Sequence, residues 1–293
     1  MSFQMRGVYT AIITPFDEQG NFDEATYRNL IDFQIENGID GIVPCGTTGE
    51  SPTLSHEEQD RVIEVTVEQV NKRIPVVAGT GSNSTKEAVR LTAHAQKAGV
   101  DGVMLVNPYY NKPTQKGLFL HFKEIASTVD IPCMVYNIKG RTAVNMETDT
   151  LMELCDACQN IIAVKEASGD MEQMRSVIER RRDGFAVMSG DDNIALQLVE
   201  AGGDGVVSVA SNLIPGKMVE MIHAGLKGDF QAAKALEASL SGFFQAMFVE
   251  TNPIPIKTAM AMAGKCTEVF RLPMCSLSSE ENRQIVAAAV ANL

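Results

Sequence analysis

The chain has 293 residues, of which 45% are hydrophobic and 21% are charged, so it can bury a sizeable core and is not a disordered protein. Its formal net charge of −12 argues against a nucleic-acid partner and against docking on an anionic membrane, because both require basic patches. No basic stretch followed by an apolar region opens the sequence, and no run approaches the roughly 18 apolar residues of a membrane span. We therefore expect a cytoplasmic protein with no membrane-spanning segment.

Short apolar runs and amphipathic stretches alternate along most of the chain. The runs predict strands at residues 8–14, 76–79, 133–136, 161–165 and 185–189. The amphipathic stretches predict helices at residues 23–37, 56–71, 85–97, 115–129, 171–182 and 193–201.

One local pattern recurs three times, at residues 36–43, 97–104 and 200–207. In each copy a glycine suits the left-handed end of a helix, and an Asp-Gly pair leads into an apolar, β-branched run. Such a run suits a strand that is buried on both faces, as in a parallel sheet. These junctions supply the second, fourth and eighth predicted strands.

Eight strands that alternate with helices predict an α/β fold, a (β/α)8 TIM barrel, which typically needs about 250 residues. We assign residues 1–229 to this catalytic barrel and residues 230–293 to a C-terminal helical extension packed on it. All of residues 217–293 is expected to be helical.

The clearest candidate for chemistry is Lys165, which follows the apolar run Ile161-Ile-Ala-Val. In a barrel of this kind, catalytic groups lie at the carboxyl ends of strands. An amine held against an apolar wall has a lowered pKa, roughly 7–8 where lysine acts at neutral pH, and can attack a ketone to form an imine. The alternative is a lysine that only extends from a strand end into solvent.

Two further strand ends carry suitable polar groups. Tyr136 ends the strand before the one that carries Lys165, and the second strand leads into Cys45-Gly-Thr-Thr-Gly-Glu-Ser51. The glycines of this loop let successive backbone N–H groups converge on an anion such as a carboxylate, and Thr47 could pass a proton to a tyrosine. A carboxylate site, a phenol and an imine-forming amine at one barrel mouth suit a 2-oxo acid.

A metal site is not expected. Cys155 and Cys158 form a Cys-x-x-Cys pair, but no second pair and no suitably spaced histidines follow it. We interpret these two cysteines as small packing residues.

The ordered motifs of the chain resemble those of the dihydrodipicolinate synthase family, which belongs to a larger family that includes N-acetylneuraminate lyase. The resemblance runs from about Gly7 to Pro273. The motifs are Ile13-Thr-Pro-Phe16, Gly46-Thr-Thr-Gly-Glu-Ser51, Ala78-Gly-Thr-Gly81, Asn107-Pro-Tyr-Tyr-Asn111, Tyr136-Asn-Ile-Lys-Gly-Arg-Thr142, Val164-Lys-Glu-Ala167, Ser189-Gly-Asp-Asp192 and Asn252-Pro-Ile-Pro-Ile-Lys257.

The resemblance implies an activity and a set of roles. Lys165 forms an imine with pyruvate, and the enamine attacks L-aspartate 4-semialdehyde on the route to lysine, with no separate cofactor. Tyr136 is the general acid/base, and Thr47 and Tyr110 complete its proton relay. Among the binding residues, Thr48 holds the pyruvate carboxylate, while Gly190 and the carbonyl of Val207 line the pocket.

The family also implies an assembly, because Tyr110 reaches the site from the neighbouring subunit. We therefore expect a homo-oligomer, a tetramer built as a pair of tight dimers.

Arg141 distinguishes between branches of the larger family. Relatives of the synthase type use an arginine here to hold the carboxylate of the semialdehyde, for which a planar bidentate donor is well suited. Sialic acid lyases usually lack it. Lys139 stands where the family usually has proline, and we expect it to loosen this loop.

The resemblance further implies an effector site for lysine at a dimer interface, formed by His56, Asn83, Glu87 and Tyr109. Gln59 stands where a second histidine or a glutamate is usual, and these residues could instead satisfy one another without any effector. Two other functions stay open: a pyruvate-dependent lyase for sialic acid or a 2-keto-3-deoxy sugar acid, and a catalytically silent barrel that binds a keto acid.

Overall fold

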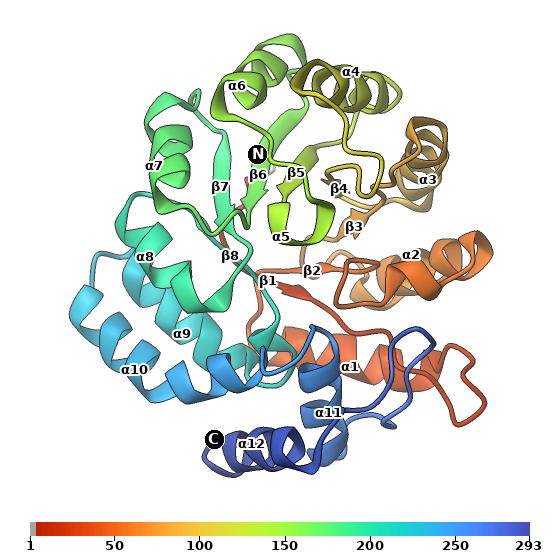
Figure 1. Ribbon diagram of the computed structural model, residues 1–293, viewed down its shortest axis with the longest axis vertical. Helices are drawn as coiled ribbons and strands as arrows, with labels where there is room; N and C mark the ends of the chain where they lie inside the picture. Colours follow the sequence, from red (N-terminus) through yellow and green to blue (C-terminus); the bar gives the residue numbers. More distant parts are fainter. Residues whose placement is uncertain (1–3) are drawn as a thin grey trace.

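The computed structural model describes residues 4–293, and eight parallel strands form its centre (Figure 1). They are β1 (Gly7–Ala11), β2 (Gly41–Val43), β3 (Val77–Gly79), β4 (Gly102–Val106), β5 (Cys133–Asn137), β6 (Ile161–Glu166), β7 (Ala186–Ser189) and β8 (Gly205–Ser208). The hydrogen-bonded order is β2-β1-β8-β7-β6-β5-β4-β3, and a parallel bridge between Ile42 and Val76 joins the two ends. The predicted (β/α)8 barrel is confirmed, although the first strand ends three residues before the predicted end at residue 14.

Helices form a ring outside the strands (Figure 1). They are α1 (Glu24–Glu36), α2 (His56–Val70), α3 (Thr85–Ala98), α4 (Gln115–Ala126), α6 (Thr148–Ala157), α7 (Met171–Arg180), α8 (Ala195–Glu200) and α9 (Pro215–Leu226). The short α5 (Lys139–Thr142) lies inside this ring, over the end of the barrel (Figure 1). The six predicted helices are confirmed to within a few residues at each end. The alternation of strands and helices implies a helix in the place of α6, but no bounds were predicted for α5 or α6, and neither has a side-chain N-cap, which is one of the main signals of a helix start.

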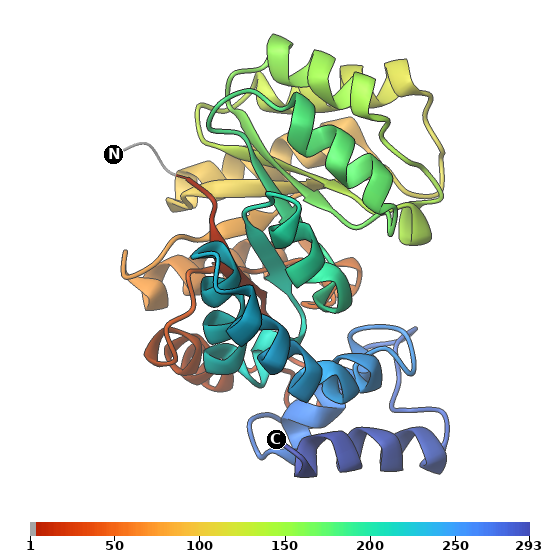
Figure 2. The ribbon, with the colours of Figure 1, turned by 90° about the vertical axis from the view of Figure 1, so that its left-hand side faces the viewer.

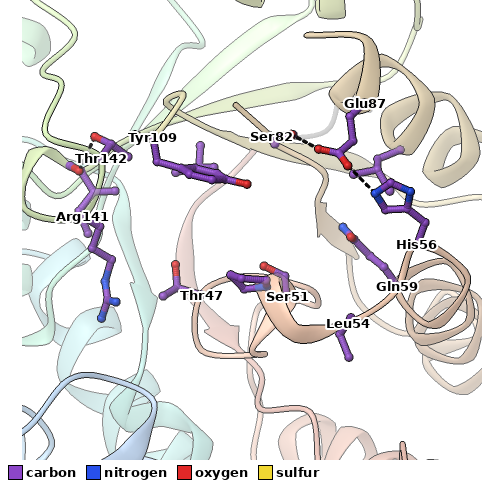
Figure 3. Close-up of a pocket in the computed structure, with 15 residues that line it drawn as sticks. Thr47, Ser51, Leu54, His56, Gln59, Ser82, Glu87, Tyr109, Arg141 and Thr142 are labelled. Carbon is purple, nitrogen blue, oxygen red and sulfur yellow. Dashed lines mark hydrogen bonds and ion pairs between the residues drawn. The ribbon is translucent and has the colours of Figure 1, made fainter. Parts of the chain in front are cut away.

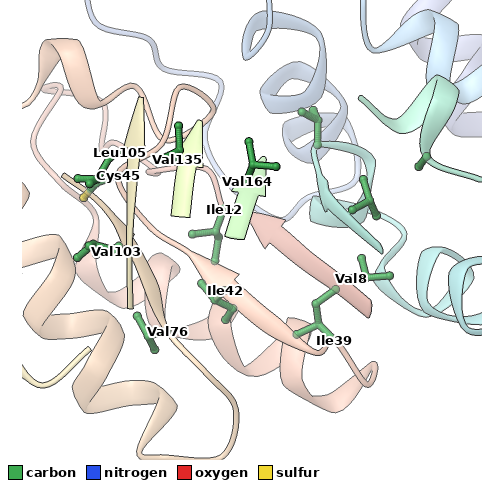
Figure 4. Close-up of a cluster of buried hydrophobic side chains, with 14 of the residues drawn as sticks. Val8, Ile12, Ile39, Ile42, Cys45, Val76, Val103, Leu105, Val135 and Val164 are labelled. Atoms are coloured by element: carbon green, nitrogen blue, oxygen red, sulfur yellow. The ribbon is translucent and has the colours of Figure 1, made fainter. Parts of the chain in front are cut away.

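The barrel has an inner and an outer apolar layer, because successive strand residues point to opposite faces. The inner layer includes Met104 and Met134, which face the centre of the barrel. The outer layer includes Val103, Leu105 and Val135, which pack against the helices (Figure 4). Polar groups that face the centre are therefore buried between apolar walls.

The three Asp-Gly junctions share one set of hydrogen bonds at the amino-terminal end of the barrel. Each aspartate carboxylate accepts a hydrogen bond from the backbone N–H of a residue on or next to the preceding strand. The backbone N–H of the same aspartate donates to the carbonyl of that residue. The pairs are Asp40 with Val8, Asp101 with Val76 and Asp204 with Val187, at 2.8–3.0 Å. The repeated motif thus fixes the starts of neighbouring strands.

The C-terminal part contains α10 (Phe230–Ala246), α11 (Ile254–Met262) and α12 (Glu280–Ala291), of which α11 and α12 lie at one end of the molecule (Figure 2). The prediction that residues 217–293 are helical throughout is wrong, because residues 263–279 form an irregular segment. Gly264 has a φ of 69°, which ends α11, and Pro273 lacks the N–H that a helix interior needs. Nothing between residues 4 and 293 forms a helix that is both long and apolar enough to span a membrane.

Candidate active site

Lys165 and Tyr136 are paired neighbours on β6 and β5, and both belong to the inner wall of the barrel. The Lys165 Nζ lies 4.0 Å from the centroid of the Tyr136 ring. Only 5% of Lys165 and 4% of Tyr136 is exposed. The sequence therefore predicted correctly that these two groups meet inside the barrel.

Burial changes the acidity of both groups. Loss of solvation lowers the pKa of Lys165 to about 7; the Asp192 carboxylate acts against this shift and the Arg141 charge adds to it. The neutral, nucleophilic form of the amine is therefore available near physiological pH. Burial raises the pKa of Tyr136 to about 12, so this residue rests as a protonated phenol that can donate its proton and take one back afterwards.

Gly190 leaves room for the lysine. A Cβ atom at this position would lie 2.9 Å from the Cε of Lys165 and 2.6 Å from the Cβ of Ala167, which is too close for any side chain. Val207, on β8, is buried in the same inner layer. Both residues predicted to line the pocket therefore lie on the inner wall.

The Gly46–Ser51 loop follows β2 and contains Thr47 and Thr48. Two short backbone turns shape it, with hydrogen bonds from Gly49 N to Gly46 O (3.1 Å) and from Glu50 N to Thr47 O (3.1 Å). Thr48 is buried, whereas Thr47 is partly exposed.

A buried ion pair that the sequence did not predict holds this loop from behind. The Lys257 Nζ of α11 lies 2.6 Å from the Glu50 carboxylate, which also accepts the backbone N–H of Arg271 at 3.3 Å. The Lys257 ammonium lies over the Phe16 ring, 4.1 Å from its centroid. A lone lysine within the apolar stretch of α11 is the one local sign of this contact.

Asn252 connects two predicted binding residues and was also missed. Its side-chain amide donates to the Thr48 hydroxyl at 3.0 Å, and its backbone carbonyl accepts the Arg141 Nη2 at 2.9 Å. Arg141 is exposed and belongs to α5, a helix that begins at Lys139. Lys139 is thus the first residue of a helical turn, and the expectation that it loosens this segment stays a prediction.

Some of the predicted site residues line one cavity of about 420 Å³: Thr47, Arg141, His56, Glu87 and Tyr109. Arg141 lies at one side of the cavity, His56 and Glu87 lie at the other, and Thr47 and Tyr109 lie between them (Figure 3).

The predicted effector residues interact with one another. The His56 Nε2 lies 2.5 Å from the Glu87 carboxylate, which also accepts the Ser82 hydroxyl (Figure 3). These two contacts lower the pKa of Glu87. The Asn83 amide donates to the Tyr109 carbonyl at 3.1 Å. The four predicted residues thus form two hydrogen-bonded pairs, His56 with Glu87 and Asn83 with Tyr109.

Tyr110 differs from the other predicted catalytic residues. Its exposed fraction is 91%, and its backbone adopts a φ of 73°, which is uncommon for a non-glycine residue. The site of its own chain therefore does not enclose this side chain.

Cys155 and Cys158 are buried at the end of α6, and burial raises the pKa of the Cys155 thiol to about 12. Within residues 4–293, no group of three or more His, Cys, Asp or Glu side chains is arranged to hold a metal ion.

Comparisons with known proteins agree with this geometry. Residues 4–292 match the model of the dihydrodipicolinate synthetase family. The chain is 53% identical, over 274 residues, to the 4-hydroxy-tetrahydrodipicolinate synthase of Syntrophobacter fumaroxidans, a match that covers 93% of this chain and 94% of that protein.

Solved structures are similar over nearly the whole chain. The crystal structure of dihydrodipicolinate synthase from Aquifex aeolicus has a TM-score of 0.96 and 47% identity, with 98% of this chain and 97% of that chain covered. That of the enzyme from Cyanidioschyzon merolae with lysine bound has a TM-score of 0.94 and 39% identity, with 98% and 99% covered. The chain therefore belongs to the dihydrodipicolinate synthetase family.

Proposed function

We propose that this chain is a 4-hydroxy-tetrahydrodipicolinate synthase, a lyase that condenses pyruvate with L-aspartate 4-semialdehyde in lysine biosynthesis. The observation that carries this proposal is the pair formed by Lys165, with its pKa lowered to about 7, and the Tyr136 phenol inside the barrel. Relatives of about 50% identity that bear this name support it.

The neutral Lys165 amine attacks the keto carbon of pyruvate, and loss of water gives a protonated imine. This imine withdraws electrons, so the methyl group loses a proton and an enamine forms. The enamine carbon attacks the aldehyde carbon, which becomes a hydroxyl-bearing carbon. The amino group of the semialdehyde then attacks the imine carbon, closes the ring and releases Lys165 as a free amine. Tyr136 transfers the protons with Thr47, and no separate cofactor takes part.

The two substrates present one carboxylate each. Thr48, together with the backbone N–H groups of its loop, receives the pyruvate carboxylate, while Gly190 and the Val207 carbonyl line the same subsite. Arg141 receives the carboxylate of the semialdehyde at the mouth. The Asn252 contacts with Thr48 and Arg141 support this division, because they hold the two carboxylate-binding residues at a fixed separation.

The enzyme acts in the cytoplasm as a homotetramer, in which Tyr110 completes the proton relay of a neighbouring subunit. The 91% exposure of Tyr110 supports this role. Analytical ultracentrifugation tests the assembly, and a fully active monomer would contradict it.

Lysine inhibits the enzyme by binding in the cavity, beside the polar residues His56, Asn83, Glu87 and Tyr109. The lysine complex of the Cyanidioschyzon merolae enzyme supports this proposal. The Glu87 carboxylate would receive the effector's ammonium group. A rate that stays constant during a titration with lysine would exclude it.

The test of the activity is borohydride reduction in the presence of pyruvate, followed by peptide mass mapping and an assay with L-aspartate 4-semialdehyde. The expected result is a reduced pyruvyl adduct on Lys165 and turnover of the semialdehyde; Lys165→Arg is the control that forms no adduct. An adduct without turnover of the semialdehyde would favour the alternative function, a pyruvate-dependent lyase for sialic acid or a 2-keto-3-deoxy sugar acid. The absence of an adduct in the unmodified protein would refute the mechanism.

A further inference from the structure

A second pair of residues lies one step beyond the reacting pair. Tyr136 and Lys165 are register partners on β5 and β6, and the next partners along these strands are Asn137 and Glu166. Since successive side chains alternate between the faces of a strand, Asn137 and Glu166 point away from the centre of the barrel. The contact of Glu166 with Gln173 of α7 agrees with this direction.

The Glu166 carboxylate contacts only hydrogen-bond donors. It accepts the backbone N–H of Ser168 at 2.8 Å, the Asn137 Nδ2 at 3.2 Å and the Gln173 Nε2 at 3.2 Å. Only 1% of the residue is exposed, so water does not replace these partners. Such a set of donors requires an acceptor at both oxygens, which an ionised carboxylate provides and a carboxamide does not.

The direction of the Asn137 amide is determined by a backbone group. The Met146 N–H, which can only donate, lies 3.0 Å from the Asn137 Oδ1, and the Asn107 amide donates to the same oxygen at 2.8 Å. The Asn137 Nδ2 must therefore face Glu166. The network thus links Asn107, which follows β4, to Asn137 of β5 and Glu166 of β6. Through Met146 it reaches the segment that follows α5, the helix that carries Arg141.

The backbone at this level is tied to the site as well. The Glu166 carbonyl accepts the N–H of Gly190 at 2.8 Å, and the Asn137 carbonyl accepts the N–H of Ala167 at 2.9 Å. A side chain at position 190 would collide with both Ala167 and Lys165. Because these hydrogen bonds are made by backbone carbonyls, the wall around the lysine does not depend on the side chains of Asn137 and Glu166.

We propose that Glu166 is a positioning residue for the reaction: through Asn137 it holds Tyr136 and the Arg141 segment in place against Lys165. This inference rests on the proposed imine chemistry. Glu166 itself does not touch the substrates, because it lies behind the barrel wall.

The first test is Glu166→Gln, which turns an NH2 group toward the NH2 group of Asn137 or Gln173. We expect kcat to fall at least about tenfold, because small displacements of catalytic groups have effects of this size or larger. The KM for pyruvate and the fraction of protein trapped by borohydride with pyruvate should stay close to those of the unmodified enzyme, because Lys165 and the Gly46–Ser51 loop are not altered.

The matched variant is the double substitution Asn137→Asp with Glu166→Gln, which exchanges the carboxylate and the amide across the pair. The new carboxylate still accepts from Met146 and Asn107, and the new amide donates to it; the exchange removes the hydrogen bond that the Asn137 Nδ2 donates to the Asn145 Oδ1 at 2.9 Å. We expect kcat to recover to within about threefold of the unmodified enzyme, since the hydrogen bond across the pair is restored.

Three results would overturn the proposal: an unchanged kcat in Glu166→Gln, a double variant as slow as the single one, or a parallel loss of kcat and of trapping. Circular dichroism and thermal melting monitor the fold; if neither variant folds, Glu166 serves the fold and the proposal fails. A missing pyruvate adduct in the unmodified enzyme would instead refute the proposed function.

Discussion

Lys257 and Glu50 form an ion pair of 2.6 Å in which neither side chain is more than 1% exposed. The pair joins α11 to the loop that carries Thr47 and Thr48, so the C-terminal part of the chain directly supports the substrate loop. Burial lowers the pKa of Lys257, and the Glu50 carboxylate acts against this shift.

Removal of one partner should therefore strongly destabilise the protein. We expect Lys257→Met to lower the free energy of unfolding by about 3–5 kcal/mol, because it leaves Glu50 charged, buried and without its cation. The double variant Lys257→Met with Glu50→Gln should regain most of this loss. Urea unfolding at fixed protein concentration measures both, and equal stabilities of the single variant and the unmodified protein would contradict the expectation.

The pH dependence of imine formation should follow the Lys165 amine. The rate of adduct formation should rise as the pH increases through about 7 and then level off, because only the neutral amine attacks pyruvate. Asp192→Asn removes the carboxylate that raises the pKa of Lys165, so the rising limb should move to lower pH. Borohydride trapping at a series of pH values measures this limb, and a shift to higher pH would contradict the assignment.

Tyr136→Phe removes the phenolic proton and leaves the ring beside the lysine. We expect kcat to fall by about 10²–10⁴, the usual contribution of a general acid/base. The pyruvate adduct should still form on long incubation, which separates proton transfer from binding. Steady-state kinetics together with mass mapping checks this, and an unchanged kcat would remove Tyr136 from the relay.

Arg141→Ala should act mainly on the second substrate. Loss of a charged hydrogen bond of about 1.5–3 kcal/mol corresponds to a rise of roughly 10- to 150-fold in the KM for L-aspartate 4-semialdehyde. The KM for pyruvate should change little. A variant in which pyruvate is affected more than the semialdehyde would assign Arg141 to the other carboxylate.

Asp101→Ala tests the repeated junction at the amino-terminal end of the barrel. It leaves the buried N–H of Val76 without its side-chain partner, so the protein should lose about 1–3 kcal/mol of stability. Since the active site lies at the other end, kcat at a temperature where the variant is folded should be unchanged. Thermal melting and steady-state assays on the same sample check both statements.

Much of the fold and part of the site can be predicted because their signals are local. The alternation of apolar runs and helices identifies the eight strands, and the position of Lys165 at a strand end marks it for chemistry. By contrast, Lys257 and Glu50 are 207 residues apart, and Asn252 and Thr48 are 204 apart. No local pattern encodes such contacts, which form only when the chain closes on itself.

The hydrogen bonds of Asp40, Asp101 and Asp204 lie at one end of the barrel, and the residues proposed for substrate chemistry lie at the other. These hydrogen bonds fix strand register at the end of the barrel opposite to the substrates, and they use carboxylates that take no part in chemistry. Loops at the substrate end can therefore change in sequence while the strand pairing is preserved. A barrel organised in this way can acquire a new substrate preference by mutation with little loss of folding stability.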